Sequence, residues 1–517
     1  MDTAWANPDR LAALREGLTR VGDRPTFPVE APFTGERIAD VPACIAADVD
    51  AAVAQAREAG TAWAARPVAE RADVLSDFHD IVLDRQDDLL DVMQLETGKT
   101  RRDAFEEVLD VAATAQHYAT RTDLLASERR AGALPGLTKT VVHRHPVGVV
   151  GLITPWNYPL TLTVSDALPA LLAGNGVVLK PDESTTHTAL LARDLLEDAG
   201  LPPGLLQVVS GDGADLGEPL ISRVDHIGFT GSTAVGREVG ALAGEHLTDV
   251  SLELGGKNPL LVLDDADPEK AAAGAVRASF ANAGQLCIST ERLYVHADAY
   301  DEFVDAFVRE TRNLALGAGF EYGPEMGSLQ SEQQLEKVAA HVEDAVARGA
   351  TVLAGGRDRP DLGPYFYEPT VLEDVTAEMT LSGEETFGPV VALYEVDSVE
   401  EAVERANDSP YGLNASVWTT DTDRGERVAE RIECGTVNVN EGYAAAWASI
   451  DAPMGGMKDS GVGRRHGDEG LLKYTESQTV ATQRGVRIDP GPLPQSLWTA
   501  GLTLGLRALK RVSGWVR

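Results

Sequence analysis

The stretch "VGVVGLITPWNYP", residues 147–159, decides the fold class. It begins with the apolar run "VGVVGLIT", which is typical of a strand buried on both faces of a sheet. The prolines that bracket "PWNYP" mark a turn, and a helix is expected from about Thr161 to Leu172. Strand, turn and helix in this order predict the first unit of a doubly wound parallel sheet.

Similar units follow along the chain. Further buried strands are expected at "NGVVLKP" (175–181), "LLQVVSG" (205–211) and "HIGFTGS" (226–232), with helices near 184–199, at 213–221 and from about Ser232. A second alternating series runs from "SLELGGKNPLLVL" (251–263) to "GTVNVN" (435–440). Residues 46–125 are expected to be helical, and 136–148 and 471–483 to be strands outside both sheets. The sequence therefore predicts an α/β protein with two doubly wound parallel-sheet domains and a small separate β element.

The charge balance excludes some functions. The chain has 81 Asp and Glu against 45 Lys and Arg, a formal net charge of −36. Such an acidic surface disfavours nucleic-acid binding, which needs basic patches. Because the excess is spread along the chain, it favours a protein that stays hydrated in the concentrated salt of a halophilic cytoplasm. A merely acidic mesophilic enzyme is the alternative.

The three cysteines, Cys44, Cys287 and Cys434, are widely spaced and form no Cys/His ligand cluster. A disulfide framework, a zinc site or another metal site is therefore not expected. The N-terminus lacks the core of a signal peptide, and no apolar run approaches the ~18 residues of a membrane span. These features predict a reduced, cytoplasmic protein.

Three positions could carry chemistry. Cys287 in "NAGQLCIST" (282–290) is either a small buried hydrophobe or a nucleophilic thiol on a turn. Asn157, held between prolines, either belongs to the turn or aims its amide at a developing oxyanion. Glu253, at a strand end before two glycines, either caps the turn or faces a cleft.

Other loops are candidates for ligand binding. In "GFTGST" (228–233) the backbone amides and Ser232 could hold a pyrophosphate at a helix N-terminus, or the segment is a simple tight turn. Lys180 and Glu183 follow a strand end, where a carboxylate can accept bonds from ribose hydroxyls, unless both are solvated charges. "EETFGPV" (384–390) combines a carboxylate, an aromatic ring and a Gly-Pro turn.

Taken in order, these pieces resemble the aldehyde dehydrogenase superfamily over about residues 30 to 480. The motifs that carry the resemblance are "PWNYP", "KPDE", "GFTGST", "LELGGKNP", "GQLC", "EETFGPV", "YGLNASVW" and "PMGGMKDSGVGRRHG". The 34-residue separation of Glu253 and Cys287 also matches the family's spacing of base and nucleophile. The resemblance identifies Cys287 as the catalytic thiol.

The resemblance implies a mechanism. The Cys287 thiolate attacks an aldehyde, Asn157 and the Cys287 N–H hold the oxyanion, a hydride passes to the nicotinamide, and Glu253 activates water to hydrolyse the thioester. It also implies that the residues that bind the cofactor are Lys180, Glu183, Gly231, Ser232, Glu385, Phe387 and Trp156. Lys99 and Glu476 are expected to act at most through neighbouring residues. Glu183 favours NAD over NADP, although high salt would screen its repulsion of a 2′-phosphate and leave NADP as an alternative.

The sequence also bears on which aldehyde is the substrate. Several details are similar to a branch labelled succinate-semialdehyde dehydrogenase, but Ser165 stands where established enzymes of that branch carry an arginine. Arg292 or Arg464 could replace this cation, unless each forms an ordinary salt bridge. The alternatives are a broad aliphatic or aromatic aldehyde dehydrogenase and a non-catalytic dinucleotide-binding protein; acyl transfer to coenzyme A is disfavoured by Glu253.

The resemblance also implies a domain organisation and a homodimer or homotetramer. We expect an NAD-binding Rossmann-like domain at residues 1–127 and 144–252, and a catalytic domain with the thiol at residues 253–455. Oligomerisation strands are expected at residues 128–143 and 470–485, and an amphipathic basic helix at residues 490–517. The helix is expected to pack on the chain's own acidic surface or on a partner subunit; contact with an anionic membrane surface is the alternative.

Overall fold

The computed structural model describes residues 3–132, 138–484 and 489–513. The chain divides into two compact units. The larger unit comprises Met1–Leu124 and Pro146–Thr475, and the smaller one comprises Leu125–His145 and Glu476–Arg517.

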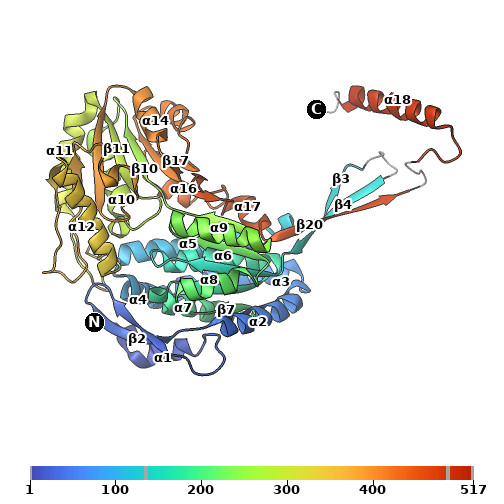
Figure 1. Cartoon of the computed structure of the whole chain (residues 1–517), viewed down its shortest axis with the longest axis horizontal. Coiled ribbons are helices and arrows are strands. Elements are labelled where there is room, and N and C mark those ends of the chain that lie inside the picture. The colour runs from blue at the N-terminus through green and yellow to red at the C-terminus, as the bar shows by residue number, and fades with distance from the viewer. Residues whose placement is uncertain (1–2, 133–137, 485–488, 514–517) are drawn as a thin grey trace. The chain divides into compact units, whose positions relative to one another are not determined.

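The larger unit contains a six-stranded sheet with the strand order β19-β9-β8-β5-β6-β7. Its edge strand β7 is labelled in Figure 1. Its strands are β5 (Val149–Thr154), β6 (Gly176–Pro181), β7 (Leu206–Val208), β8 (His226–Thr230), β9 (Asp249–Glu253) and β19 (Gly461–Val462). Only β19 pairs antiparallel. The connecting helices are α6 (Pro159–Ala173), α7 (Thr186–Asp198), α8 (Gly213–Ile221) and α9 (Thr233–His246).

The chain reverses its direction across this sheet between β5 and β8. From β5 it moves outward to β6 and β7, and it then returns to add β8 and β9 on the other side of β5. Ile153 pairs in register with Lys180 of β6 and with Phe229 of β8, so the carboxyl ends of these parallel strands lie at one edge. This reversal is the topological switch point at which open α/β sheets bind ligands.

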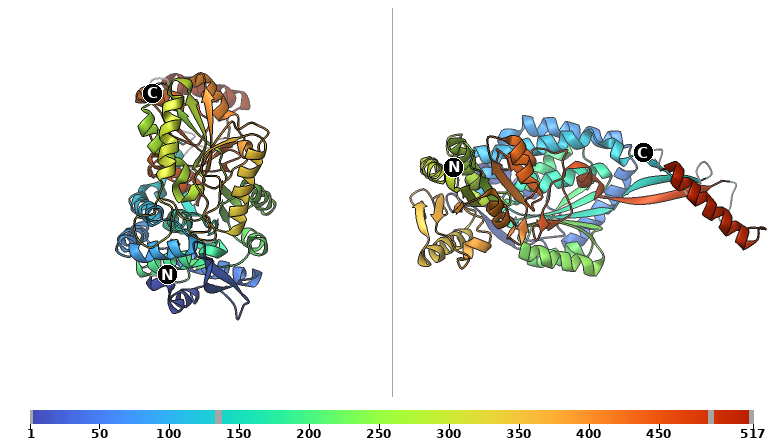
Figure 2. Two further views of the ribbon diagram at one scale, coloured as in Figure 1. Left: turned by 90° about the vertical axis from the view of Figure 1, so that its left-hand side faces the viewer. Right: turned by 90° about the horizontal axis from the view of Figure 1, so that it is seen from above.

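A seven-stranded sheet in the order β12-β13-β14-β11-β10-β16-β17 forms the second layered region of this unit. Its strands are β10 (Asn258–Val262), β11 (Thr290–His296), β12 (Thr351–Ala354), β13 (Thr370–Glu373), β14 (Val390–Val396), β16 (Asn414–Trp418) and β17 (Thr436–Val439). The flanking helices include α10 (Pro268–Phe280), α11 (Ala297–Asn313), α12 (Glu332–Ala347), α14 (Val399–Asn407) and α15 (Thr422–Ala429). Leu260, Leu293 and Leu393 are buried in its core. Figure 2 shows helices around both sheets, and the predicted fold class is confirmed.

The N-terminal region is partly as predicted. Four helices occupy the expected helical stretch: α2 (Ala46–Ala64), α3 (Val68–Asp84), α4 (Gln86–Thr97) and α5 (Arg101–Ala119). Gly98 ends α4 in the left-handed region, with φ of 66°. Helix α1 (Pro8–Arg15) and the hairpin of β1 (Thr26–Ala31) and β2 (Glu36–Pro42) were not predicted.

The smaller unit holds a three-stranded sheet and a C-terminal helix. The strands are β3 (Glu128–Arg130), β4 (Thr138–Pro146) and β20 (Thr475–Gln483), so the two predicted separate strands exist. The prediction was wrong at residues 471–472, which end helix α17 (Gly467–Leu472), and residues 136–137 lie outside the described part. In helix α18 (Gln495–Ser513), Leu497, Leu504 and Leu506 are exposed; residues 514–517 of the predicted helix are not described.

Within the described residues, no helix combines the length and apolar character needed to cross a bilayer. The same residues contain no cluster of three or more His, Cys, Asp and Glu side chains that could hold a metal ion. The assignment of separate tasks to the domain ranges predicted from sequence stays a prediction.

Candidate active site

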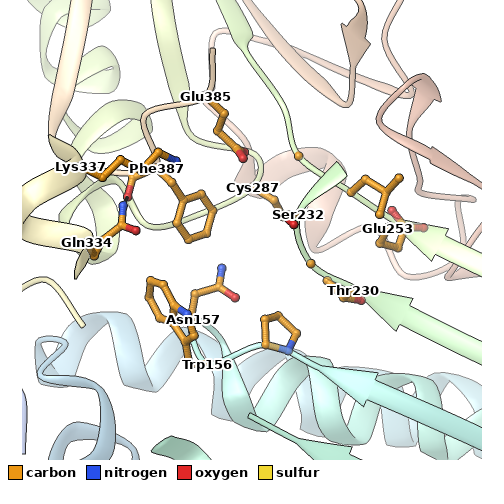
Figure 3. A pocket seen from close by; sticks show the side chains of 14 residues that line it. Trp156, Asn157, Thr230, Ser232, Glu253, Cys287, Gln334, Lys337, Glu385 and Phe387 are labelled. Atoms are coloured by element: carbon orange, nitrogen blue, oxygen red, sulfur yellow. Dashed lines mark hydrogen bonds between the residues drawn. The ribbon is translucent and has the colours of Figure 1, made fainter. Parts of the chain in front are cut away.

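A pocket lies at the switch point, beyond the ends of β5 and β8. We name it the proximal pocket; it encloses about 210 Å³ and is lined by Pro155, Trp156, Asn157, Thr230, Gly231, Ser232, Glu253, Leu254, Gly255, Cys287, Gln334, Lys337, Glu385 and Phe387. Trp156 and Asn157 reach it from one side, and Glu385 and Phe387 reach it from another (Figure 3). The lining includes every site residue predicted from sequence except Lys180 and Glu183.

The loop that carries Cys287 is held in one conformation. After α10 the chain makes three consecutive left-handed residues, with φ of 51° at Asn282, 55° at Ala283 and 70° at Gly284. A Cβ on Gly284 would lie 2.2 Å from the carbonyl oxygen of Gly388, so only glycine fits there. Asn258 Nδ2 donates to the Cys287 carbonyl at 2.8 Å. The turn and this clamp together place the thiol in the pocket wall.

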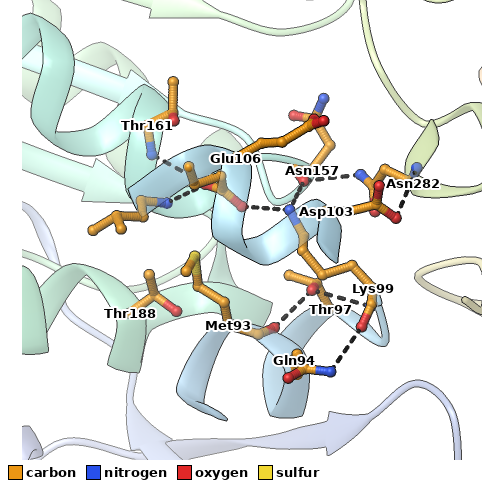
Figure 4. Close-up of polar contacts among 12 residues, drawn as sticks. Met93, Gln94, Thr97, Lys99, Asp103, Glu106, Asn157, Thr161, Thr188 and Asn282 are labelled. Atoms are coloured by element: carbon orange, nitrogen blue, oxygen red, sulfur yellow. Dashed lines mark hydrogen bonds and ion pairs between the residues drawn. The ribbon is translucent and has the colours of Figure 1, made fainter. Parts of the chain in front are cut away.

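Asn157 is positioned through its backbone carbonyl (Figure 4). That oxygen accepts from Lys99 Nζ at 2.7 Å and from Asn282 Nδ2 at 3.0 Å. Lys99 is 1% exposed and pairs with the fully buried Glu107. Because Glu107 also accepts from the first N–H groups of α6, at Leu160 and Thr161, one buried ion pair fixes both Asn157 and the helix that follows.

The loop opposite Asn157 is fixed by a second buried ion pair. Glu291, paired with Lys257, accepts from the backbone N–H groups of Thr386 and Phe387. Phe387 adopts a left-handed φ of 55°, and its ring meets Trp156 edge to face at 5.6 Å. Loop and turn thus form a rigid aromatic wall across the pocket.

The electrostatics of the proximal pocket favour neutral groups. Burial raises the pKa of the Cys287 thiol to about 12, and the charges of Glu385 and Glu253 add to this. Burial also raises the pKa of Glu253 to about 7 and that of Glu385 to about 7. Glu253 therefore exchanges between acid and carboxylate near neutral pH, as a general base requires. The thiol itself is protonated there, so attack needs a base to take its proton.

Lys180 and Glu183 lie at the same sheet edge but outside the proximal pocket. Lys180 Nζ lies 3.3 Å from Glu183 Oε1 at the end of β6. Burial raises the pKa of Glu183, and the neighbouring Lys180 opposes that shift. The pair remains where a ligand that extends along the edge from β8 to β6 would reach it.

The residues around the proximal pocket fit a nicotinamide dinucleotide. Gly231 and Ser232 stand at the N-terminus of α9, where N–H groups and the helix dipole favour phosphate. Glu385 offers carboxylate acceptors for ribose hydroxyls. A Cβ on Gly255 would lie 2.7 Å from Glu385 Oε2, so this glycine keeps the space beside the carboxylate open.

A second pocket, here named the distal pocket, shares Asn157 and Cys287 with the proximal one. Its lining is Asn157, Tyr158, Thr161, Leu162, Leu286, Cys287, Ile288, Tyr443, Trp447, Met454 and Arg465. Sequence reasoning missed Arg465 and named its neighbour Arg464 instead. It also missed Gln334 and Lys337 of α12 in the proximal pocket, because an exposed amphipathic helix gives no signal of which polar residues face a ligand.

The two arginines suggested from sequence are engaged elsewhere. The Arg292 guanidinium donates to the carbonyls of Lys257 and Ala406, at 2.8 and 3.0 Å. Arg464 donates to the carbonyls of Gly456 and Gly463, at 3.0 and 2.6 Å. Neither lines the proximal or the distal pocket.

Comparison with known proteins gives a consistent assignment. The sequence model described as "Aldehyde dehydrogenase family" matches residues 20–480. A Mycobacterium tuberculosis protein named "Putative succinate-semialdehyde dehydrogenase", with NADP(+) specified in its name, is 51% identical over 506 residues, which are 98% of this chain and 97% of that protein.

Solved structures agree with this result. Succinate-semialdehyde dehydrogenase from Burkholderia pseudomallei is 37% identical with a TM-score of 0.85, covering 89% of this chain and 95% of that one. Betaine aldehyde dehydrogenase from Staphylococcus aureus, solved with NAD+, is 31% identical with a TM-score of 0.88, covering 94% of this chain and 99% of that one.

Proposed function

Because this chain belongs to the aldehyde dehydrogenase family, we propose that it oxidises succinate semialdehyde to succinate through a thiohemiacetal and a thioester on Cys287. The family and its relatives make it an NAD(P)-dependent oxidoreductase. The observation that carries the proposal is that Cys287, Asn157 and Glu253 line one pocket, beside residues that fit a dinucleotide.

Each of the three residues has a step to perform. The Cys287 thiol loses its proton to solvent water, its sulfur bonds to the aldehyde carbon, and the carbonyl oxygen becomes an oxyanion that accepts from the Asn157 amide and the Cys287 N–H. A nicotinamide dinucleotide bound by Ser232 and Glu385 would supply the hydride acceptor that conversion of the thiohemiacetal to a thioester requires. Glu253 then removes a proton from the water that attacks the thioester carbon, and the carbon–sulfur bond breaks to release the acid.

Asn157 can serve the oxyanion without losing its present contact. Its amide nitrogen donates one hydrogen to the Gln285 carbonyl at 3.0 Å. An amide carries two N–H groups, so the second is available for the oxyanion. The contact with Gln285 therefore orients the donor.

Product analysis tests the proposal. Incubation with succinate semialdehyde and NAD or NADP in molar KCl is expected to give equimolar succinate and reduced cofactor without a thiol acceptor. A product that forms only when coenzyme A is supplied would support acyl transfer instead. Absence of turnover with this aldehyde would contradict the proposed substrate.

A broad aliphatic or aromatic aldehyde dehydrogenase is the second candidate. The distal pocket favours it, because Leu162, Leu286, Ile288, Trp447 and Met454 make most of its wall apolar. Turnover of butyraldehyde, the neutral four-carbon counterpart, at the same kcat/KM as succinate semialdehyde would select this candidate.

Glu183 and Lys180 bear on the preference for NAD or NADP. The Glu183 carboxylate supports a preference for NAD, whereas its pairing with Lys180 reduces the repulsion of a 2′-phosphate and supports use of NADP as well. We further propose that the protein is a cytoplasmic homo-oligomer assembled through strands β4 and β20. Light scattering of the full chain tests the assembly, because it measures the molar mass of the oligomer.

A further inference from the structure

Arg465 is the only Lys, Arg, Asp or Glu among the described residues that line the distal pocket. The pocket also contains Cys287, so an aldehyde that is bonded to that sulfur and extends away from the cofactor shares the pocket with this guanidinium. The surrounding wall is largely apolar. A charged group on the substrate would therefore be buried without a partner unless Arg465 supplied one.

The guanidinium is buried but incompletely hydrogen-bonded. Arg465 is 5% exposed. Its Nε and Nη2 atoms are buried and make no hydrogen bond within the described residues, although Nη2 lies 3.5 Å from Asp166 Oδ2. Unpaired buried donors are costly. Nε and Nη2 lie side by side on one edge of the guanidinium, and such an edge can bind a carboxylate through both oxygens.

The charges near Arg465 leave part of its positive charge uncompensated. Asp166 is shared with Lys473, whose Nζ lies 3.1 Å from Oδ1. Asp110 accepts a hydrogen bond from Ser165 at 2.7 Å, and burial raises its pKa. Glu253 also acts on Arg465, and burial raises its pKa to about 7. Two fixed cations therefore face one ionised carboxylate, Asp166, and two carboxyl groups, Asp110 and Glu253, that burial pushes towards their neutral forms.

The backbone directs Arg465, and not Arg464, into this pocket. Arg465 and Met454 exchange backbone hydrogen bonds, at 2.7 and 2.8 Å, and His466 follows in the left-handed region with φ of 61°. Met454 also lines the pocket. This bridge fixes the side of the chain on which the Arg465 side chain leaves the backbone.

We propose that Arg465 binds the distal carboxylate of the substrate and makes the enzyme selective for short aldehydes that end in a carboxylate. The inference rests on the proposed function and deepens it by naming the residue that recognises the acid. It also explains how Ser165 can stand where an arginine was expected: the cation comes from the loop before α17, and Ser165 instead holds Asp110 beside it.

Comparison of Arg465→Met with Arg464→Met tests the proposal. We expect Arg465→Met to lower the ratio of kcat/KM for succinate semialdehyde to kcat/KM for butyraldehyde by at least about 100-fold, because only the first substrate carries the carboxylate. Arg464→Met, the adjacent control, is expected to leave the ratio of the two substrates unchanged. Arg465→Lys keeps the charge and should recover part of the loss, mainly in KM.

A binding measurement separates this inference from the proposed function. Succinate is expected to protect Cys287 from alkylation by iodoacetamide in the wild type at a concentration at least tenfold below that needed in Arg465→Met. Butyrate should show no such difference. Equal protection by succinate in the two proteins, or an equal loss of both activities in Arg465→Met and Arg465→Lys, would overturn the role of Arg465. Failure of the wild type to oxidise succinate semialdehyde would instead overturn the proposed function.

Discussion

The proximal and distal pockets meet at Cys287 but carry different charged groups: Glu253, Glu385 and Lys337 line the first, whereas Arg465 is the charged residue among the described residues that line the second. The proximal pocket presents Glu253 and Glu385, which raise the pKa of the thiol, whereas Arg465 of the distal pocket lowers it. A carboxylate on the substrate would meet two carboxyl groups beside one lysine on the first side, and an arginine without a lining carboxylate on the second. The difference indicates that charge, as well as shape, decides from which side an aldehyde approaches the sulfur.

Removal of the shared sulfur should have the largest effect. Cys287→Ser is expected to lower aldehyde oxidation by at least about 10⁴-fold, because the weakly nucleophilic hydroxyl replaces the thiol. Binding of NAD, followed by tryptophan fluorescence, should remain within about threefold because the proximal pocket is otherwise intact. Cys434→Ser, a control at another buried thiol, should keep most of the activity. Turnover near the wild-type value would remove Cys287 from the mechanism.

Replacement of Glu253, the proposed general base in the proximal pocket, should have the second-largest effect on turnover. Glu253→Gln is expected to lower steady-state kcat by about 10²–10⁴-fold, while one equivalent of reduced cofactor still forms in a burst. The pKa of Glu253 is raised to about 7, so in the wild type the carboxylate fraction, and with it hydrolysis, rises as pH increases through about 7. This rise should be absent from the variant. A variant that shows no burst but the same pH profile would contradict the assignment.

Asn157→Ala should have a similar or smaller effect. Loss of one oxyanion donor typically costs about 10²–10³-fold in kcat. Because Lys99 and Asn282 contact the backbone carbonyl, which the variant keeps, the turn should persist and cofactor binding should change little. A kcat within a factor of two of the wild type would show that the oxyanion is stabilised elsewhere.

The smallest effect is expected at Glu183, which lies outside the proximal pocket at the same edge of the sheet, and it concerns the choice between NAD and NADP. Glu183→Gln is expected to raise kcat/KM for NADP relative to NAD by about tenfold, since it removes a like charge near the 2′-phosphate and frees Lys180 to pair with it. The change should shrink in molar KCl because salt screens charges that are partly exposed. An unchanged ratio at low salt would place the adenosine ribose away from β6.

Much of this architecture follows from local sequence. The strands of both sheets are buried apolar runs, and Asn157, Ser232 and Glu253 directly follow or end such strands, so their common edge could be predicted. The β1–β2 hairpin was missed because β1 contains Pro28 and burial does not alternate along β2, although it does alternate along β1. The features of the site that could not be predicted depend on contacts between segments that are distant in the sequence.

Arg464 and Arg465 show most clearly which features of the site cannot be predicted from the sequence. Both sit in "GRRHG", and neither periodicity nor charge distinguishes them. The distinction comes from the bridge to Met454 and the left-handed His466, which are backbone features that no residue type announces. The burial of Lys99 beneath Asn157 is likewise a contact between segments 58 residues apart.

Trapping the covalent intermediate tests most directly the claim that the substrate and the cofactor, bound in the two pockets, react at the Cys287 sulfur. Glu253→Gln would be mixed with succinate semialdehyde, with and without NAD, quenched in acid, digested and analysed by mass spectrometry. We predict a succinyl group on the peptide that contains Cys287, and only when NAD is present. A succinyl group on the peptide of Cys44 or Cys434, or no adduct while reduced cofactor still forms, would contradict the account.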